Sequence, residues 1–167
     1  TGGVNLADEY INEYKRFGHW KDCGILVRGK AVWSMTVMFL TMWQYTAGGD
    51  EDYERFRPDE FELLDKEQND GFVQPYSDSP HDTENVSENI YMNIIERAKD
   101  YVYITTPYLI LDDAMETSLK NAAKAGVDVR IITPHIPDKK LVFEATRASY
   151  MPLMKAGVKI YESLSLK

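Results

Sequence analysis

The chain has 167 residues, of which 44% are apolar and 28% charged, which is the composition of an ordinary globular protein. This composition excludes collagen-like, low-complexity and wholly disordered chains. The formal net charge is −8, and this acidic balance disfavours nucleic acid as the main partner, because a phosphate backbone is bound by a surplus of basic residues.

The first part of the chain, residues 1–47, is predicted to form a turn, a short helix after Asn5, a buried strand over 22–28 and a helix over 31–45. The last of these is apolar on nearly all sides, which is typical of a helix buried between layers. Cys23 is the single cysteine, so an intramolecular disulfide is excluded. Its apolar neighbours predict a buried thiol in the strand.

Residues 48–70 differ from the rest of the chain in charge. They contain ten acidic and three basic residues, net −7, and the other residues are close to neutral. This stretch is predicted to be an acidic linker or surface insert.

The second part, residues 72–162, predicts the order β-α-β-α-β-α-β. Each expected strand is a short apolar run bounded by proline or glycine, and each expected helix has an apolar stripe. The strands are expected at 72–76, 101–106, 127–133 and 158–162. Such alternation predicts a mainly parallel sheet flanked by helices, and therefore an α/β fold.

No apolar stretch reaches the roughly 20 residues that a membrane-spanning helix needs. The longest, residues 31–43, has thirteen. We therefore expect the chain by itself to be soluble. It begins without Met at Thr1 and stops directly after a strand-like run, so we also expect it to be part of a longer protein.

Two predicted strands end in similar turns, at 105–108 and 133–140. The second turn combines an imidazole (His135), a carboxylate (Asp138), two lysines and a helix N-terminus, which suits a phosphate or phosphodiester. The alternative is a rigid turn with solvated lysines. His135 has no acid–base or nucleophile partner that the sequence identifies, and His19, His81 and His135 have no metal-ligand spacing, so no metal site is predicted.

Asp22 stands at the start of a predicted strand, where a carboxylate can hold an imidazole through its Nδ1–H. The alternative is a surface ion pair with Lys21 or Arg28. Both interpretations remain open at this point.

Several stretches resemble bacterial cardiolipin synthases of the phospholipase D superfamily. Residues 1–12 (TGGVNLADEYIN) resemble the segment that directly follows the first H-x-K-x-x-x-x-D motif of that family. The stretches that resemble its second half are 71–80, 88–91, 106–109 and 130–140. The resemblance covers residues 1–47 and 71–162.

The resemblance implies a reaction. In this family one motif histidine attacks the phosphodiester and forms a phosphohistidine, and the other protonates the leaving alcohol and deprotonates the incoming one. The phosphatidyl group of one phosphatidylglycerol moves to a second, and glycerol is released. The resemblance implies no cofactor and no metal, with phosphatidylglycerol and an anionic bacterial cell membrane as partners and no nucleic acid.

Neither motif is complete in this chain, because no histidine is followed by Lys two residues later and Asp five residues after that. The resemblance places the first motif before Thr1 and the second after Lys167. We therefore expect an inactive inter-motif segment without the family's membrane helices. It would comprise the end of an incomplete first phospholipase D-like subdomain (1–47), the acidic linker (48–70) and a second subdomain (71–167).

The resemblance also implies roles for individual residues. Gly3 and Asn5 match the G-G-x-N tail of the first motif, where the asparagine supports the phosphate site, and Asp22 matches the carboxylate that orients the first histidine. The residues expected at the site edge or on substrate are Pro107, Tyr108, His135 and Lys139.

Two further interpretations stay open: a catalytically inactive phospholipase D-like binding module, and another phosphodiesterase of the superfamily. Because its subdomain is incomplete, the helix over 31–45 is expected to pack on the second half or on another copy of the chain, which adds a homodimer to the expected partners.

Overall fold

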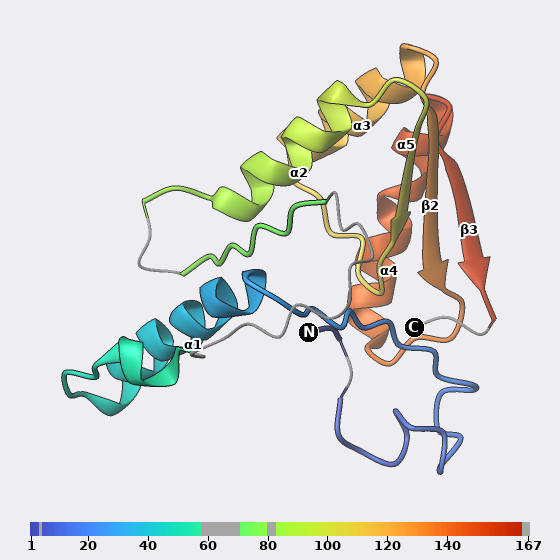
Figure 1. The fold of residues 1–167 in the computed structure, drawn as a ribbon. Helices are drawn as coiled ribbons and strands as arrows, with labels where there is room; N and C mark the ends of the chain where they lie inside the picture. Colours follow the sequence, from blue (N-terminus) through green and yellow to red (C-terminus); the bar gives the residue numbers. More distant parts are fainter. Residues whose placement is uncertain (4, 58–70, 80–82, 165–167) are drawn as a thin grey trace. The chain divides into compact units, whose positions relative to one another are not determined.

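The computed structural model describes residues 1–3, 5–57, 71–79 and 83–164. The chain divides into two compact units. One contains Thr1 and Ile25–Ser87, and the other contains Gly2–Gly24 and Glu88–Lys167 (Figure 1).

The larger unit is built on a three-stranded parallel sheet in the order β1 (Tyr101–Thr105), β2 (Asp128–Pro134), β3 (Lys159–Ser163). Val102 of β1 pairs with Val129 of β2, and Ile131 of β2 pairs with Ile160 of β3. The predicted parallel α/β architecture and these three strands are therefore confirmed, with bounds shifted by one residue or so.

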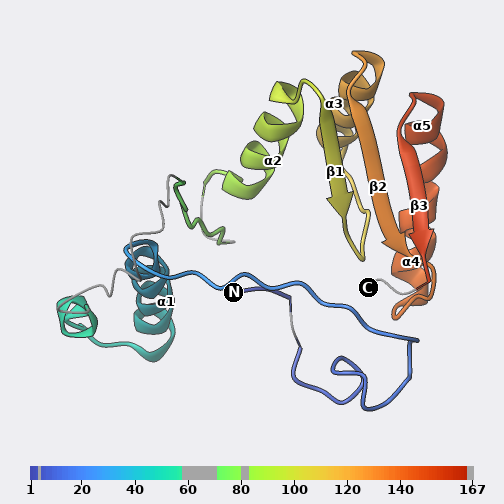
Figure 2. The same ribbon diagram turned by 45° about the vertical axis from the view of Figure 1, so that its right-hand side comes forward.

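The helices of this unit are α2 (Val86–Arg97), α3 (Asp113–Lys124), α4 (Lys140–Ala148) and α5 (Tyr150–Lys155). Two successive crossovers that advance in the same direction, with the usual right hand, place their helices on the same face of a sheet. Figure 2 shows α3, α4 and α5 behind the three strands. The two helices are separated at Ser149, and Pro152 lies in the first turn of α5, where a proline is tolerated.

The core lies between this helical layer and one face of the sheet. Leu119 of α3, Ile131 of β2 and Leu153 of α5 are each 0% exposed. On the opposite face, Tyr101 and Tyr103 are more than half exposed. The alternation of inward and outward side chains along each strand explains this difference.

The two crossover helices end in the same way. Gly126 and Gly157 have φ values of 96° and 104°, and the residue after each glycine donates its N–H to a carbonyl five residues earlier. This is the glycine-terminated helix end that the repeated sequence Lys-Ala-Gly-Val predicts, because a left-handed backbone favours glycine. Each turn delivers the chain directly into the next strand.

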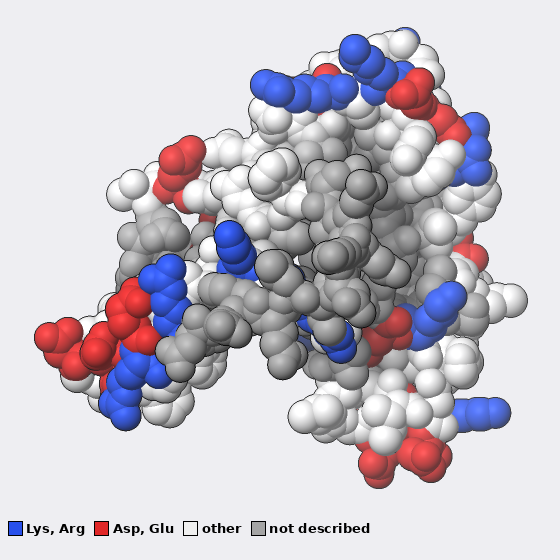
Figure 3. Space-filling view, in the orientation of Figure 1, with Lys and Arg blue, Asp and Glu red and all other residues white. Residues whose placement is uncertain are grey.

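Polar side chains bind the strands together near their amino ends. Asp128 of β2 accepts hydrogen bonds from Lys159 of β3 (2.8 Å), Arg130 of β2 (2.8 Å) and Tyr103 of β1 (3.0 Å). The Arg130 guanidinium and the Lys159 ammonium hold the pKa of the Asp128 carboxyl well below its usual range. Figure 3 shows acidic and basic side chains intermingled at the top of the view, where the strands begin.

Residues 2–24 belong to this unit but do not form the predicted helix and strand. Residues 7–14 form successive turns, and Leu6 is 97% exposed. The predicted helix fails because a helix this short depends on packing of its apolar stripe, and Leu6 has none. Trp20 holds this segment together, because it is 8% exposed and its ring lies edge-on to Tyr10 at 4.4 Å.

The strand predicted over 22–28 is also wrong. Only an isolated antiparallel bridge forms, between Gly2 and Gly24, and Cys23, predicted to be buried, is exposed. A strand needs a partner for its backbone groups along its length, and within the described residues only 1–3 provide one. Gly2 is required there, since a Cβ atom would lie 2.6 Å from the Cys23 carbonyl oxygen.

The other unit contains α1 (Ala31–Ala47) and η1 (Tyr53–Phe56). The helix is confirmed, but its predicted burial is not, because only Leu40 is buried and Phe39, Met42 and Trp43 are more than half exposed. The apolar pattern predicted the helix correctly, but it does not identify which residues would pack against the apolar side chains of α1. The strand predicted over 72–76 is absent as well, and Phe72 is fully exposed.

The acidic stretch is described only in part. Tyr53 donates a hydrogen bond to Gln44 (2.5 Å) and the Arg57 guanidinium lies 5.5 Å from the Trp33 ring centre, so the start of this stretch packs on α1. Residues 58–70 of the predicted linker lie outside the described residues. Within the described residues, no helix is long and apolar enough to cross a bilayer.

The buried core predicts a strong contrast between two leucines. Leu119→Ala should lower the free energy of unfolding by about 2–5 kcal/mol, because it removes a buried side chain and leaves a cavity. Leu141→Ala, at a site that is 88% exposed, should change it by less than about 0.5 kcal/mol. Urea unfolding followed by circular dichroism measures both, and equal effects would contradict this description of the core.

Candidate functional site

The candidate site lies where the three parallel strands end. Parallel strands bring their carboxyl ends to the same edge, which is where open α/β sheets bind ligands. The loops after β1 and β2 are joined to this edge by backbone hydrogen bonds: Thr106 N–H donates to Ile132 O (3.1 Å) and His135 N–H donates to Ser163 O (2.9 Å). The two turns that the sequence singled out are therefore neighbours in the fold.

His135 has a partner that sequence analysis did not find. Its Nδ1 lies 2.8 Å from Oε2 of Glu162, at the end of β3. An ionised carboxylate only accepts hydrogen bonds, so Nδ1 carries the proton. Among the described residues Nε2 has no hydrogen-bond partner, and it is the nitrogen available to a ligand.

Arg147 of α4 holds the same carboxylate. Its Nε and Nη2 donate to the two oxygens of Glu162 at 2.9 and 3.0 Å, a bidentate pair. The Arg147 guanidinium, with a smaller contribution from His135, lowers the pKa of Glu162, and Glu162 raises the pKa of Arg147. Glu162 therefore fixes both the His135 ring and the last turn of α4.

Buried hydroxyl groups fix the backbone behind this edge. Thr146 of α4, 0% exposed, accepts a hydrogen bond from the N–H of Leu109 (3.0 Å), and Ser149 donates to the Leu109 carbonyl (3.4 Å). Thr133 of β2 and Tyr150 of α5 share a hydrogen bond of 2.5 Å, and burial raises the pKa of the Tyr150 hydroxyl. These side chains join α4 and α5 to the loop after β1 and to β2.

Tyr108 and Lys139 form the second part of the edge. The Tyr108 hydroxyl donates to Asp138 (2.7 Å), and the Lys139 ammonium lies 5.5 Å from the centre of the Tyr108 ring. Burial and the Asp138 carboxylate raise the pKa of Tyr108 to about 12, so the hydroxyl stays protonated. Pro107 is exposed and lies just beyond the end of β1.

The residues predicted near the N-terminus lie in the same compact unit. Asp22 is half-buried and accepts a hydrogen bond from the Trp20 indole (2.7 Å), and a Cβ on Gly3 would lie 3.9 Å from its Oδ1. Neither Lys21 nor Arg28 pairs with Asp22 among the described ion pairs. Asn5 is exposed and makes no hydrogen bond within the described residues.

This N-terminal segment reaches the sheet edge at Gly18. Gly18 has a φ of 86°, and a Cβ there would lie 3.3 Å from the Ile136 side chain. Residues 2–24 therefore pack against the loop that carries His135. Within the described residues, no three histidine, cysteine or acidic side chains converge as a metal site.

The edge as a whole presents an imidazole nitrogen and an ammonium group, both held by acidic or aromatic neighbours. The ammonium group can donate to an anionic oxygen of a phosphate group, and His135 can do so through Nε2 when that nitrogen also carries a proton. Sequence analysis missed Glu162, Arg147 and Thr146, because their roles depend on contacts across the fold. Only the position of Glu162 at a predicted strand end was a signal that could have found it.

The role of Glu162 predicts a pH dependence. Its pKa in the folded state lies below its usual 4.5, so its stabilising effect is present above pH 4.5 and is lost as the pH falls through the lower folded value. Glu162→Gln should lower the free energy of unfolding at pH 7, and its difference from wild type should shrink below pH 4.5. The control is Glu13→Gln, since Glu13 is exposed and takes part in none of the described ion pairs. A pH-independent difference for Glu162→Gln, measured by urea unfolding, would contradict the assignment.

Comparisons with known proteins point to one family. Residues 91–167 match the family described as "Cardiolipin synthase, PLD-like domain". An uncharacterised protein of Streptococcus mutans is 53% identical over 162 residues, which are 97% of this chain and 34% of that protein. No solved structure matches the chain.

Two relatives carry a functional name. The cardiolipin synthase of Geobacillus kaustophilus is 39% identical over 164 residues, and that of Alkalihalophilus pseudofirmus is 37% identical over 162 residues. Each match covers 97% of this chain and 32% of the relative, so the chain spans about a third of their length. The chain is therefore similar to cardiolipin synthases over nearly its whole length, and residues 91–167 match the phospholipase D-like domain of that family.

Proposed function

We propose that this chain is the inter-motif part of an enzyme that transfers a phosphatidyl group between two phosphatidylglycerol molecules, giving cardiolipin and glycerol. The observation that carries the proposal is the polar carboxyl edge of the sheet. His135, Lys139, Arg147 and Glu162 all fall within the stretch that matches the phospholipase D-like domain of cardiolipin synthases.

In the proposed reaction, a histidine nitrogen attacks the phosphorus of the first phosphatidylglycerol, and the bond between phosphorus and the oxygen of the headgroup glycerol breaks. A second histidine donates its proton to that oxygen. The terminal hydroxyl of a second phosphatidylglycerol then returns a proton to this second histidine and attacks phosphorus, and the phosphorus–nitrogen bond breaks. Both histidines belong to H-x-K-x-x-x-x-D motifs in the longer enzyme, and no metal takes part.

This chain would support that chemistry without performing it. His19 and Lys21 have the H-x-K spacing, but Leu26 stands where the motif needs Asp. Asp22 would orient the first catalytic histidine, with the Trp20 indole holding one carboxylate oxygen. Gly3 and Asn5 would support the phosphate next to it.

The sheet edge would contact the substrate. His135 Nε2, once protonated, and the Lys139 ammonium would contact phosphate oxygens, while Tyr108 and Pro107 would shape the rim. The cationic groups have fixed neighbours, which lowers the entropy cost of binding.

Several wider features belong to the same proposal. The parts are the end of a first subdomain (1–47), an acidic linker (48–70) and a second subdomain (71–167). The longer enzyme would act at the bacterial cell membrane, attached by helices outside this chain. The exposed apolar residues of α1 would be covered by another part of the enzyme or by a second copy of the chain.

A second candidate is a catalytically inactive binding module, or another phosphodiesterase of the superfamily. What favours the binding module is that the chain has an anion-facing edge but no complete motif. The flanking sequence separates the candidates, since two intact motifs specify an enzyme and degenerate ones a binding module.

The chain by itself should be inactive. Incubated with phosphatidylglycerol in mixed micelles, it should release no glycerol above the blank, because groups that act together in catalysis leave little activity when removed. Turnover that is abolished by His135→Ala would contradict this expectation.

Asp22 gives the sharpest test in the full-length enzyme. Asp22→Asn should lower turnover roughly 10- to 1000-fold, because the amide keeps the shape but loses the charge that orients and stabilises an imidazolium. Asp8→Asn, in the exposed turns of the same segment, is the matched control and should leave turnover unchanged. Steady-state kinetics decide the question, and activity within about twofold of wild type for Asp22→Asn would exclude the orienting role.

A further inference from the structure

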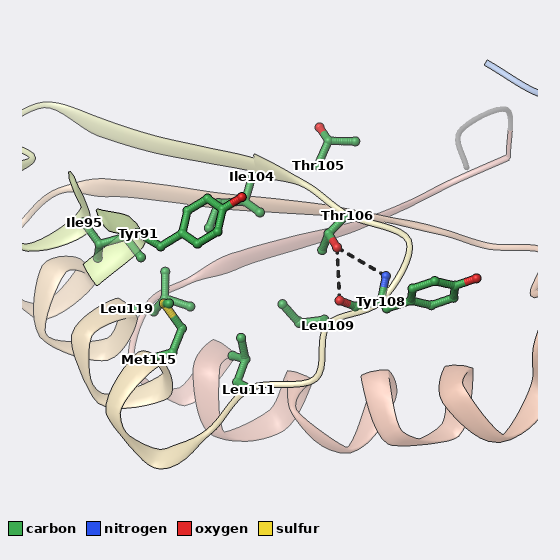
Figure 4. A pocket seen from close by; sticks show the side chains of 10 residues that line it. All are labelled: Tyr91, Ile95, Ile104, Thr105, Thr106, Tyr108, Leu109, Leu111, Met115 and Leu119. Atoms are coloured by element: carbon green, nitrogen blue, oxygen red, sulfur yellow. Dashed lines mark hydrogen bonds between the residues drawn. The ribbon is translucent and has the colours of Figure 1, made fainter. Parts of the chain in front are cut away.

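A cavity of about 240 Å³ opens in the larger unit beside the end of β1. Figure 4 shows Tyr91 of α2 and Ile104 of β1 facing Leu111 and Met115 across the space. Most of the lining is aliphatic, from α2, β1, α3 and the loop between the last two. These side chains are Ile95, Ile104, Leu109, Leu111, Met115 and Leu119.

The floor of the cavity is formed by buried core side chains, and its mouth is open. Ile95, Leu109 and Leu119 belong to the buried core, with exposures of 4%, 2% and 0%. Leu111 and Met115 are partly buried against that core, and Tyr91 is 55% exposed. Apolar surface that stays in contact with water favours an apolar guest.

The size of the cavity limits the guest. Pockets for whole small ligands are about 300–1,000 Å³, so this one is too small for a lipid molecule. At about 30 Å³ for each water-sized group, it holds a linear chain of roughly eight methylenes. A segment of one hydrocarbon chain fits this volume and this lining.

The cavity adjoins the carboxyl edge of the sheet through Tyr108. Thr106 accepts a hydrogen bond from Tyr108 N–H (3.3 Å) and donates to Tyr108 O (3.0 Å), which fixes the backbone at the border of the cavity. From there the Tyr108 ring points away from the cavity, as Figure 4 shows, and it carries Asp138 at its hydroxyl and the Lys139 ammonium over its face. Tyr108 therefore links the border of the cavity to the Lys139 ammonium and the Asp138 carboxylate.

We infer that the cavity binds one acyl chain of an anionic glycerophospholipid, whose phosphate group lies at Lys139 and His135. The inference rests on the proposed function and adds to it a subsite for the lipid tail. The apolar lining selects a hydrocarbon chain, and the adjacent ammonium selects an amphiphile with a negative head.

Two reporters in one experiment separate the tail from the head. The chain is labelled with ¹³C at its methionine methyls, and at the side chains of lysine and histidine. It is titrated with dihexanoyl phosphatidylglycerol below its micelle concentration, and in parallel with glycerophosphoglycerol, which has the same head and no tails. The short-chain lipid should shift Met115 and also Lys139 and His135, whereas the head alone should shift only Lys139 and His135. The six other methionines are internal controls.

Matched variants test the cavity itself. Leu111→Trp fills the space and should weaken binding of the short-chain lipid by at least about tenfold, because the buried methylenes supply most of the affinity. Leu141→Trp makes the same change at a site that is 88% exposed and should leave binding unchanged. Tyr91→Trp narrows the exposed mouth and serves if Leu111→Trp unfolds, which thermal denaturation reveals.

The outcomes are distinct. If Lys139 and His135 shift while Met115 does not, the inference is wrong and the proposed headgroup site stands. A structure of the full-length enzyme in which another side chain of the protein fills the cavity would also show that the inference is wrong. If neither reporter responds, both the inference and the headgroup site are contradicted. If dihexanoyl phosphatidylcholine binds as tightly as phosphatidylglycerol, the selection for an anionic lipid is wrong.

Discussion

The parallel alignment of β1, β2 and β3 is the constraint on which the rest of the larger unit depends. It brings three carboxyl ends to one edge, and it places both crossover helices on one face, where they bury Ile131 and Leu119. The alignment is held near the amino ends of the strands by Asp128, and beyond their carboxyl ends by backbone bonds from Thr106 and His135. The parallel direction of the strands therefore places the loops that follow them at one edge, whichever side chains those loops carry.

At that edge, side chains of α4 hold the loop after β1 and the end of β3 in place through hydrogen bonds. Glu162 accepts hydrogen bonds from Arg147 and His135, and the buried Thr146 accepts one from the Leu109 N–H. A buried polar group is retained at low cost only when it has a partner, and Thr146 has one. The same contacts that stabilise the packing of α4 thus determine which His135 nitrogen faces a ligand and where the loop after β1 borders the apolar cavity.

The sequence was sufficient for elements whose signals are local. Strands β1 to β3 and helix α3 were predicted because apolar runs end at Pro107 or begin after Gly126 and Gly157, and the turn at each glycine needs no distant partner. The strands predicted over 22–28 and 72–76 failed because a strand requires a neighbour that the pattern does not name. Glu162 and Arg147 were missed for the same reason, since residues 15 positions apart are brought together only by the β3 register. His135 and Tyr108 could be singled out as candidates because their side-chain chemistry at a strand end is visible in the sequence without knowledge of contacts.

The central claim is that the carboxyl edge of this sheet is one wall of a lipid phosphate site. A crystal structure of the full-length enzyme with a phosphate analogue such as vanadate bound would test it most directly. The account predicts the anion beyond the ends of β1 and β2, within hydrogen-bond distance of His135 Nε2 or the Lys139 ammonium, about 2.7–3.2 Å. The claim would be contradicted if the anion lay between the two motif histidines with both His135 and Lys139 more than about 10 Å away. That distance is the Debye length at 0.1 M salt, beyond which exposed charges are largely screened.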